Sequence, residues 1–139
     1  MTLSMRNQLS GTVLSVTEGA VMATVRVRTA SGRELTSAVT TDAVAELELT
    51  VGAPVTLLVK STEVSLATGS VDGLSIRNRI PGTVSRVTTG GAMATVKVTV
   101  EDGELTAAVT REAVEELDLA AGSPVTALVK STELSLASA

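Results

Sequence analysis

The sequence predicts a mainly β protein built from two tandem small β-barrels, each carrying one short α-helix. Three observations support this prediction. The chain of 139 residues repeats itself once, apolar and polar residues alternate along most of each copy, and one segment per copy changes to helical spacing. Several strands and a single helix within roughly 65 residues are typical of a small barrel.

The two copies align almost residue by residue. With a shift of 71 residues up to Gly32 and of 70 residues from Glu34 onward, about 40 of roughly 65 aligned positions are identical. Arg33 has no counterpart in the second copy. A segment rich in Gly and Ser separates the copies and is typical of a flexible linker. We therefore predict a first domain at residues 1–68, a linker at 69–73 and a second domain at 74–139.

Within the first copy the elements follow in a fixed order. Residues 11–19 alternate and reach a glycine turn, and residues 20–29 continue the pattern, which predicts a hairpin. A third strand is expected at 35–40, a helix at 41–49 and a closing strand at 54–67. The second copy repeats this order, so each unit is predicted to be OB-like, that is, similar to the oligonucleotide/oligosaccharide-binding barrel.

The composition excludes several classes of function. The chain has no Cys, no His and no aromatic residue, and its net charge is −4. Thiol chemistry, the usual zinc and copper ligands and the commonest general base are therefore missing. Nucleic-acid binding is disfavoured because no ring can stack on a base and the charge is negative. No segment has the length of a signal peptide or a membrane span, so we expect a soluble cytoplasmic protein without membrane or nucleic-acid partners.

Polar residues recur as faithfully as the apolar ones just ahead of the first strand of each copy. Arg offers a fork of donors, Asn an amide and Ser a hydroxyl, a set that suits an oxoanion. The alternative is that Arg and Asn bond the backbone where a strand starts. These candidate anion-binding residues are Ser4, Arg6 and Asn7, and Ser75, Arg77 and Asn78.

Three further groups recur with them. The tetrapeptide Lys-Ser-Thr-Glu is repeated unchanged at 60–63 and 130–133, although neighbouring exposed positions differ; the alternative is a solvated strand end. A threonine precedes each helix and is either an anion contact or only an N-cap. Each glycine turn offers backbone amides or only a tight turn. The candidates from these groups are Lys60, Ser61, Lys130, Ser131, Thr40, Thr110, Ala20, Val21, Gly91 and Ala92.

These motifs resemble the Mop family of molybdate-binding domains in its tandem form, the molbindins. The resemblance rests on S-x-R-N-x-x-x-G-T-V, EGAVMA, AVT before a helix, and LVKSTEVSLA. It implies molybdate or tungstate as the bound ligand, no organic cofactor, and no metal coordination by side chains. It also implies a homotrimer that holds the anion between neighbouring chains, at the residues named above.

The sequence departs from the family pattern at four positions. Met22 and Met93 replace a common Asn, and Ala43 and Ala113 replace a Ser. We expect storage and homeostasis of molybdate, and no enzyme, because no catalytic set assembles. The main alternative is a structural oligomerisation module without a physiological anion. An oligonucleotide-binding barrel and a Ser-Lys esterase are the more distant ones.

Overall fold

The computed structural model describes all residues from Met1 to Ala139 and consists mainly of strands. The first half contains β1 (Asn7–Glu18), β2 (Met22–Thr29), β3 (Glu34–Thr40), α1 (Thr41–Glu46), β4 (Pro54–Val59), the 3-10 turn η1 (Ser61–Glu63) and β5 (Ser65–Ala67). The second half contains β6 (Asn78–Thr89), β7 (Met93–Val100), β8 (Gly103–Thr110), α2 (Arg111–Glu116), β9 (Pro124–Val129), the 3-10 turn η2 (Ser131–Glu133) and β10 (Ser135–Ser138). This order confirms the predicted mainly β fold of two similar units, each with one short helix.

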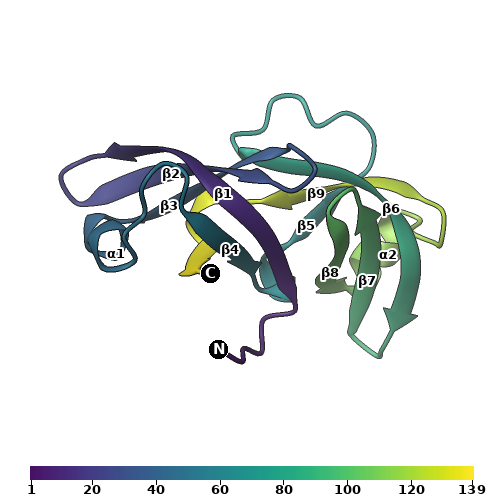
Figure 1. Cartoon of the computed structure of the whole chain (residues 1–139). Helices are drawn as coiled ribbons and strands as arrows, with labels where there is room; N and C mark the ends of the chain where they lie inside the picture. The colour runs from purple at the N-terminus through teal and green to yellow at the C-terminus, as the bar shows by residue number, and fades with distance from the viewer.

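The strands form two curled five-stranded sheets, which lie side by side in Figure 1. The strand orders are β10-β4-β1-β2-β3 and β5-β9-β6-β7-β8. The first strand of each half is long enough to pair with two partners in succession. β1 pairs with β4 along residues 7–12 and with β2 along residues 11–18, and a bulge between Val13 and Ser15 shifts the register of the β1–β2 pairing. Such a bulge bends the strand and curls the sheet.

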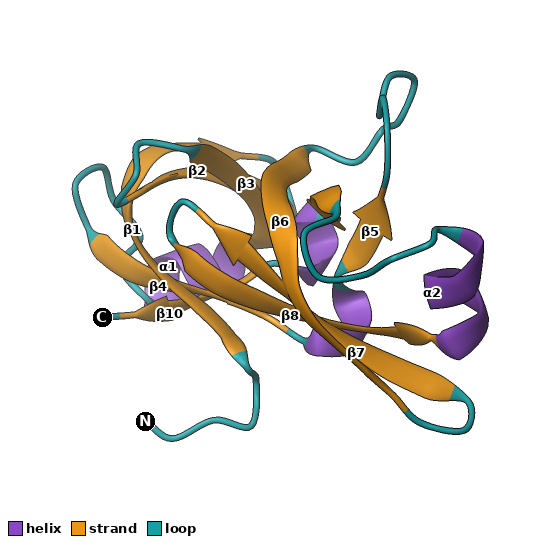
Figure 2. Ribbon diagram, turned by 90° about the vertical axis from the view of Figure 1, so that its right-hand side faces the viewer, coloured by secondary structure: helices purple, strands orange, loops and turns teal.

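The two halves exchange their last strands. β5 pairs with β9 in the second sheet, and β10 pairs with β4 in the first. Figure 2 shows β10 and the C-terminus beside β4. The closing strand expected at 54–67 is therefore two strands, because η1 interrupts it and its last part crosses to the other half.

Close approach of neighbouring strands explains the glycine in each G-T-V motif. A Cβ atom added to Gly82 would lie 2.5 Å from the carbonyl oxygen of Thr99, and one added to Gly11 would lie 2.5 Å from a methyl group of Val27. Neither position tolerates a side chain without movement of the paired strand. The sequence repeats glycine there because the sheet is tightly curled.

Valine and leucine side chains form one continuous core across both halves. Val25, Val27, Val96 and Val98 are completely buried, and the cluster extends to Leu136 of the exchanged strand β10. A core without rings is filled by branched aliphatic side chains, as volume and pattern require. Because the core is shared, the two halves form one packed body.

A carboxylate joins the two turns that meet between the halves. Asp102, in the β7–β8 turn, accepts hydrogen bonds of 2.8 Å from the Ser31 N–H, the Ser31 hydroxyl and the Thr29 hydroxyl of the β2–β3 turn. Burial alone would raise the pKa of the Asp102 carboxyl. The bonds from Ser31 and Thr29, with the charge of Arg33, outweigh it and lower that pKa below its usual value.

Candidate oxoanion-binding site

Strand pairing brings the two principal candidate motifs of the first half together. Asn7 is paired with Val59, so the residues before β1 lie beside the residues after β4. Ser4 and Arg6 belong to the first segment, and Lys60 and Ser61 to the second. All four line one pocket of about 230 Å³, together with Met5 and Thr62. We call residues 3–6 the first arm and residues 74–77 the second arm.

The second half repeats this arrangement. Asn78 is paired with Val129 in the same register, which places Ser75 and Arg77 beside Lys130 and Ser131. In the first half a guanidinium, an ammonium and two hydroxyl groups therefore come from two separate segments to one pocket, and the second half carries the same groups on segments in the same register.

The serine of each 3-10 turn has a buried hydroxyl group without a partner. The Oγ atoms of Ser61 and Ser131 are shielded from solvent and form no hydrogen bond. An unpaired buried hydroxyl costs about 1–3 kcal/mol, and native proteins seldom retain one without a reason. The same atom is unpaired in both copies, which indicates that each is kept for a ligand or a partner chain.

The positive charges around these hydroxyl groups are also uncompensated. The three ion pairs of the structure are Arg26–Glu34, Lys97–Glu104 and Arg111–Glu115. None of them involves the candidate cations Arg6, Lys60, Arg77 and Lys130, all of which are exposed. These cations are therefore available to an anion.

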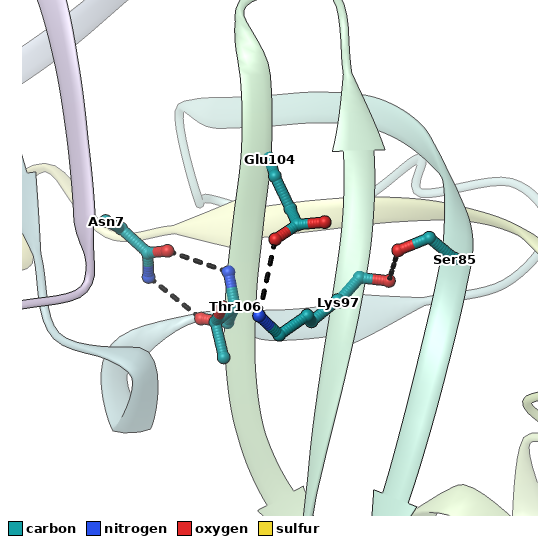
Figure 3. Close-up of polar contacts among 5 residues, drawn as sticks. All are labelled: Asn7, Ser85, Lys97, Glu104 and Thr106. Atoms are coloured by element: carbon teal, nitrogen blue, oxygen red, sulfur yellow. Dashed lines mark hydrogen bonds and ion pairs between the residues drawn. The ribbon is translucent and has the colours of Figure 1, made fainter.

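The asparagine of each arm motif bonds the opposite half. The Asn7 amide donates to the Thr106 carbonyl at 2.8 Å and accepts from the Thr106 N–H at 2.7 Å, as Figure 3 shows. Asn78 makes the same two bonds to Thr36, both at 2.8 Å. Both asparagine residues are almost completely buried. Each amide therefore pairs like a strand with the exposed edge of β8 or β3, the role that the backbone-bonding alternative anticipated.

The threonine before each helix is an N-cap. Thr40 Oγ accepts from the Ala43 N–H, and Thr110 Oγ accepts from the Ala113 N–H, each at 3.1 Å. The helices end at Glu46 and Glu116, shorter than expected, because the following residues turn into a left-handed conformation. Ala43 and Ala113 stand where the family pattern has Ser, so they offer no hydroxyl group. Their N–H groups are already bonded to the N-cap threonines.

The glycine turns lie at the far end of β1 and β6 from the arms. Gly19 N–H bonds the Met22 carbonyl at 2.8 Å, and Gly90 N–H bonds the Met93 carbonyl at 2.7 Å. The backbone N–H groups that were predicted as anion donors in these turns donate no backbone hydrogen bond, and their residues are exposed. They are the N–H groups of Ala20, Val21, Gly91 and Ala92. Met22 and Met93 are about half exposed on the same turns.

One chain does not bring all predicted donors to one place. β1 separates the first arm from the glycine turn of its own half by 12 residues, roughly 35–40 Å of strand. The opposite half comes nearer, because η1 packs against β8, and Thr62 and Val64 share a pocket with Val109 and Ala113. Within one half the arm and Lys-Ser groups are thus far from the glycine turn, whereas the Lys-Ser-Thr-Glu segment of each half lies against the threonine-bearing strand of the other half.

Two residues that contact the arms were not predicted from the sequence, because they differ between the copies. Gln8 bonds the Met5 carbonyl of the first arm, and Arg79 bonds the second arm at two carbonyl groups. Positions 8 and 79 are equivalent but not identical, so the repetition of polar residues gives no signal there. No cluster of three acidic, His or Cys residues occurs, and no helix has the length and apolar character needed to cross a bilayer.

Both copies match one protein family. Residues 3–66 and 74–136 each match the TOBE domain. The molybdenum transport protein ModE of Herbaspirillum seropedicae is 37% identical over 132 residues, which cover 94% of this chain and 49% of that protein. The molybdenum-pterin-binding protein MopB of Rhodobacter capsulatus is 39% identical over 136 residues, which cover 96% of this chain and 50% of that protein. The chain spans about half the length of both.

A solved structure matches the whole fold. The cytoplasmic molybdate-binding protein ModG, in a crystal form with molybdate bound, superimposes with a TM-score of 0.96 at 38% sequence identity, and the match covers 100% of both chains. The strand exchange and both sheets are thus included in the likeness.

Proposed function

The chain is a tandem member of the TOBE domain family, and from that premise we propose that it binds molybdate, or the similar tungstate, for storage and homeostasis in the cytoplasm. Its relatives are a molybdenum transport protein and a molybdenum-pterin-binding protein, and ModG is a cytoplasmic molybdate-binding protein. The proposed role is binding, without catalysis and without an organic cofactor.

The observation that carries this proposal is the pair of unpartnered buried hydroxyl groups. The Oγ atoms of Ser61 and Ser131 have no hydrogen-bond partner. Each serine follows a lysine that forms no ion pair and lies beside an arm whose arginine forms none either. An oxoanion is the ligand that uses all of these groups together. Its oxygens accept from the hydroxyl, the ammonium and the guanidinium.

The donor set suits molybdate held whole, as a tetrahedral dianion. Charge-assisted bonds from Arg6 and Lys60 are roughly twice as strong as neutral ones, and Ser4 and Ser61 add neutral donors. In the second half Arg77, Lys130, Ser75 and Ser131 do the same. The two cations of each cluster balance the two negative charges of the anion. No large excess of positive charge is needed, and the chain as a whole carries a net charge of −4.

We further propose that the sites are completed between chains of a homotrimer. The exposed turn amides of one chain would face the arm cluster of its neighbour, because β1 keeps the glycine turn of each half far from the arm of the same half. Asn7 and Asn78 would then contribute by placing the arms, since their amides already bond β8 and β3.

Calorimetric titration of anion-stripped protein tests the proposal. We expect saturable binding of molybdate, little response to sulfate, and a loss of roughly tenfold or more in affinity when Ser61→Ala and Ser131→Ala are combined. Ser65→Ala with Ser135→Ala is the matched control, because these serines follow the same turns, are exposed and make no side-chain bond. A wild-type trimer that takes up no molybdate would favour the structural oligomerisation module instead.

A further inference from the structure

The two arms are held by different side chains at equivalent positions. In the first half, Gln8 Nε2 donates one hydrogen bond of 3.1 Å to the Met5 carbonyl. In the second half, Arg79 donates from Nε to the Ile76 carbonyl at 3.0 Å and from Nη2 to the Leu74 carbonyl at 2.5 Å. A guanidinium can span two carbonyl groups at once because its donors form a rigid fork. The second arm is thus fixed at two points and the first at one.

A residue without counterpart adds a third contact. Arg33 Nη1 donates a longer bond of 3.4 Å to the carbonyl of Arg79 itself. The only residue inserted in the first copy therefore braces the base of the second arm. Arg79 is half-buried whereas Gln8 is exposed, so the bond from Arg79 to the Ile76 carbonyl, which is partly buried, competes less with water than the exposed bond of Gln8.

These contacts act on the backbone that carries the anion donors. Leu74 and Ile76 flank Ser75, and Ile76 precedes Arg77, so the bonds from Arg79 restrict the backbone from which both donor side chains extend. A segment that is ordered before the ligand arrives does not lose that freedom on binding, and affinity rises accordingly.

We propose that Arg79 is the positioning residue of the second arm, so that sites built on Ser75 and Arg77 bind the oxoanion more tightly than sites built on Ser4 and Arg6, and fill first. This inference rests on the proposed function. It adds that the two classes of site are unequal and names the side chain that makes them so.

Site-resolved titration with molybdate tests the inference. Lys60→Ala leaves the second-arm sites intact, and Lys130→Ala leaves the first-arm sites intact. We expect Arg79→Gln, which installs the residue type of position 8, to weaken binding roughly three- to tenfold in the Lys60→Ala background and to leave the Lys130→Ala background unchanged. The reciprocal Gln8→Arg should tighten binding in the Lys130→Ala background. Equal effects in both backgrounds, or none, would overturn the inference.

A charge-retaining variant separates positioning from electrostatic attraction. Arg79→Lys keeps the positive charge but replaces the rigid fork of the guanidinium with a single ammonium on a flexible stem, which does not hold both carbonyl groups in one geometry. We expect it to bind like Arg79→Gln. Affinity equal to that of wild type would show that only the charge matters and would overturn the positioning role.

Arm order in the anion-free protein distinguishes failure of this inference from failure of the proposed function. Backbone ¹⁵N order parameters report motion on the ps–ns timescale. Arg79→Gln should lower them at Ile76 and Arg77 and leave Met5 and Arg6 unchanged. Unchanged values at Ile76 and Arg77 would refute the positioning role. Wild-type protein that binds no molybdate, with the expected loss of order in the variant, would refute the proposed function alone.

Discussion

Removal of the Asn78 side chain should destabilise the whole molecule. Asn78 is 2% exposed and bonds both the N–H and the carbonyl of Thr36, each at 2.8 Å. Asn78→Ala removes two hydrogen bonds, worth about 1 kcal/mol each, and leaves two strand-edge groups poorly solvated at about 1–3 kcal/mol in total. We expect the free energy of unfolding to fall by about 3–5 kcal/mol.

Urea unfolding followed by far-UV circular dichroism measures this loss. Tryptophan fluorescence does not serve, because the chain has no aromatic residue. Ser10→Ala is the control, since Ser10 is exposed in β1; its effect should stay within about 0.5 kcal/mol. Protein concentration must be held constant because association stabilises the folded state. A loss below about 0.5 kcal/mol for Asn78→Ala would refute the view that this amide seals the edge of β3.

Three other predictions follow from the fold. The pKa of the Asp102 carboxyl is lowered in the folded state, so the stabilisation from this group is present above the unfolded pKa and is lost as pH falls through the folded pKa. Asp102→Asn should therefore make the free energy of unfolding less dependent on pH in the acidic range. An unchanged dependence would contradict this. Gly82→Ala should cost about 2 kcal/mol or more in thermal or urea unfolding, because its Cβ meets a backbone oxygen at 2.5 Å, whereas Gly91→Ala, with open space around it, should be nearly neutral. Residues 1–73 alone lack the strand that completes their sheet and should dimerise by exchanging β5; light scattering that finds a stable folded monomer would refute this.

The repeat made the fold class predictable, and the resemblance to the Mop family implied that Lys60 and Ser61 act at the same anion as the residues of the first arm. Alternation located the strands, and identical polar residues in both copies pointed to a shared role. The prediction of one strand over residues 54–67 missed the break within it, although the four consecutive polar residues of the Lys-Ser-Thr-Glu segment interrupt the alternation; the chain forms a 3-10 turn there. The exchange of β5 and β10 follows from that break and depends on tertiary packing alone.

The candidate site was predictable as a set of residues but not as a division of roles. Sequence repetition selects Asn7 as strongly as Arg6, although the structure buries the first and exposes the second. Only the position of β8 shows that the Asn7 amide has a backbone partner. A comparison of the copies selects only identical residues. The roles of Gln8 and Arg79, which differ, therefore follow only from their contacts in the structure.

The exchanged strands also determine when the protein can finish folding. Pairing of Leu58 with Ser135 joins residues far apart in the chain, and such contacts slow folding because a long loop must close first. Domains usually fold in turn as they leave the ribosome, the N-terminal one first. Here the first sheet stays without its edge strand until β10 has been synthesised, so the first half cannot be completed before the second half is almost fully made.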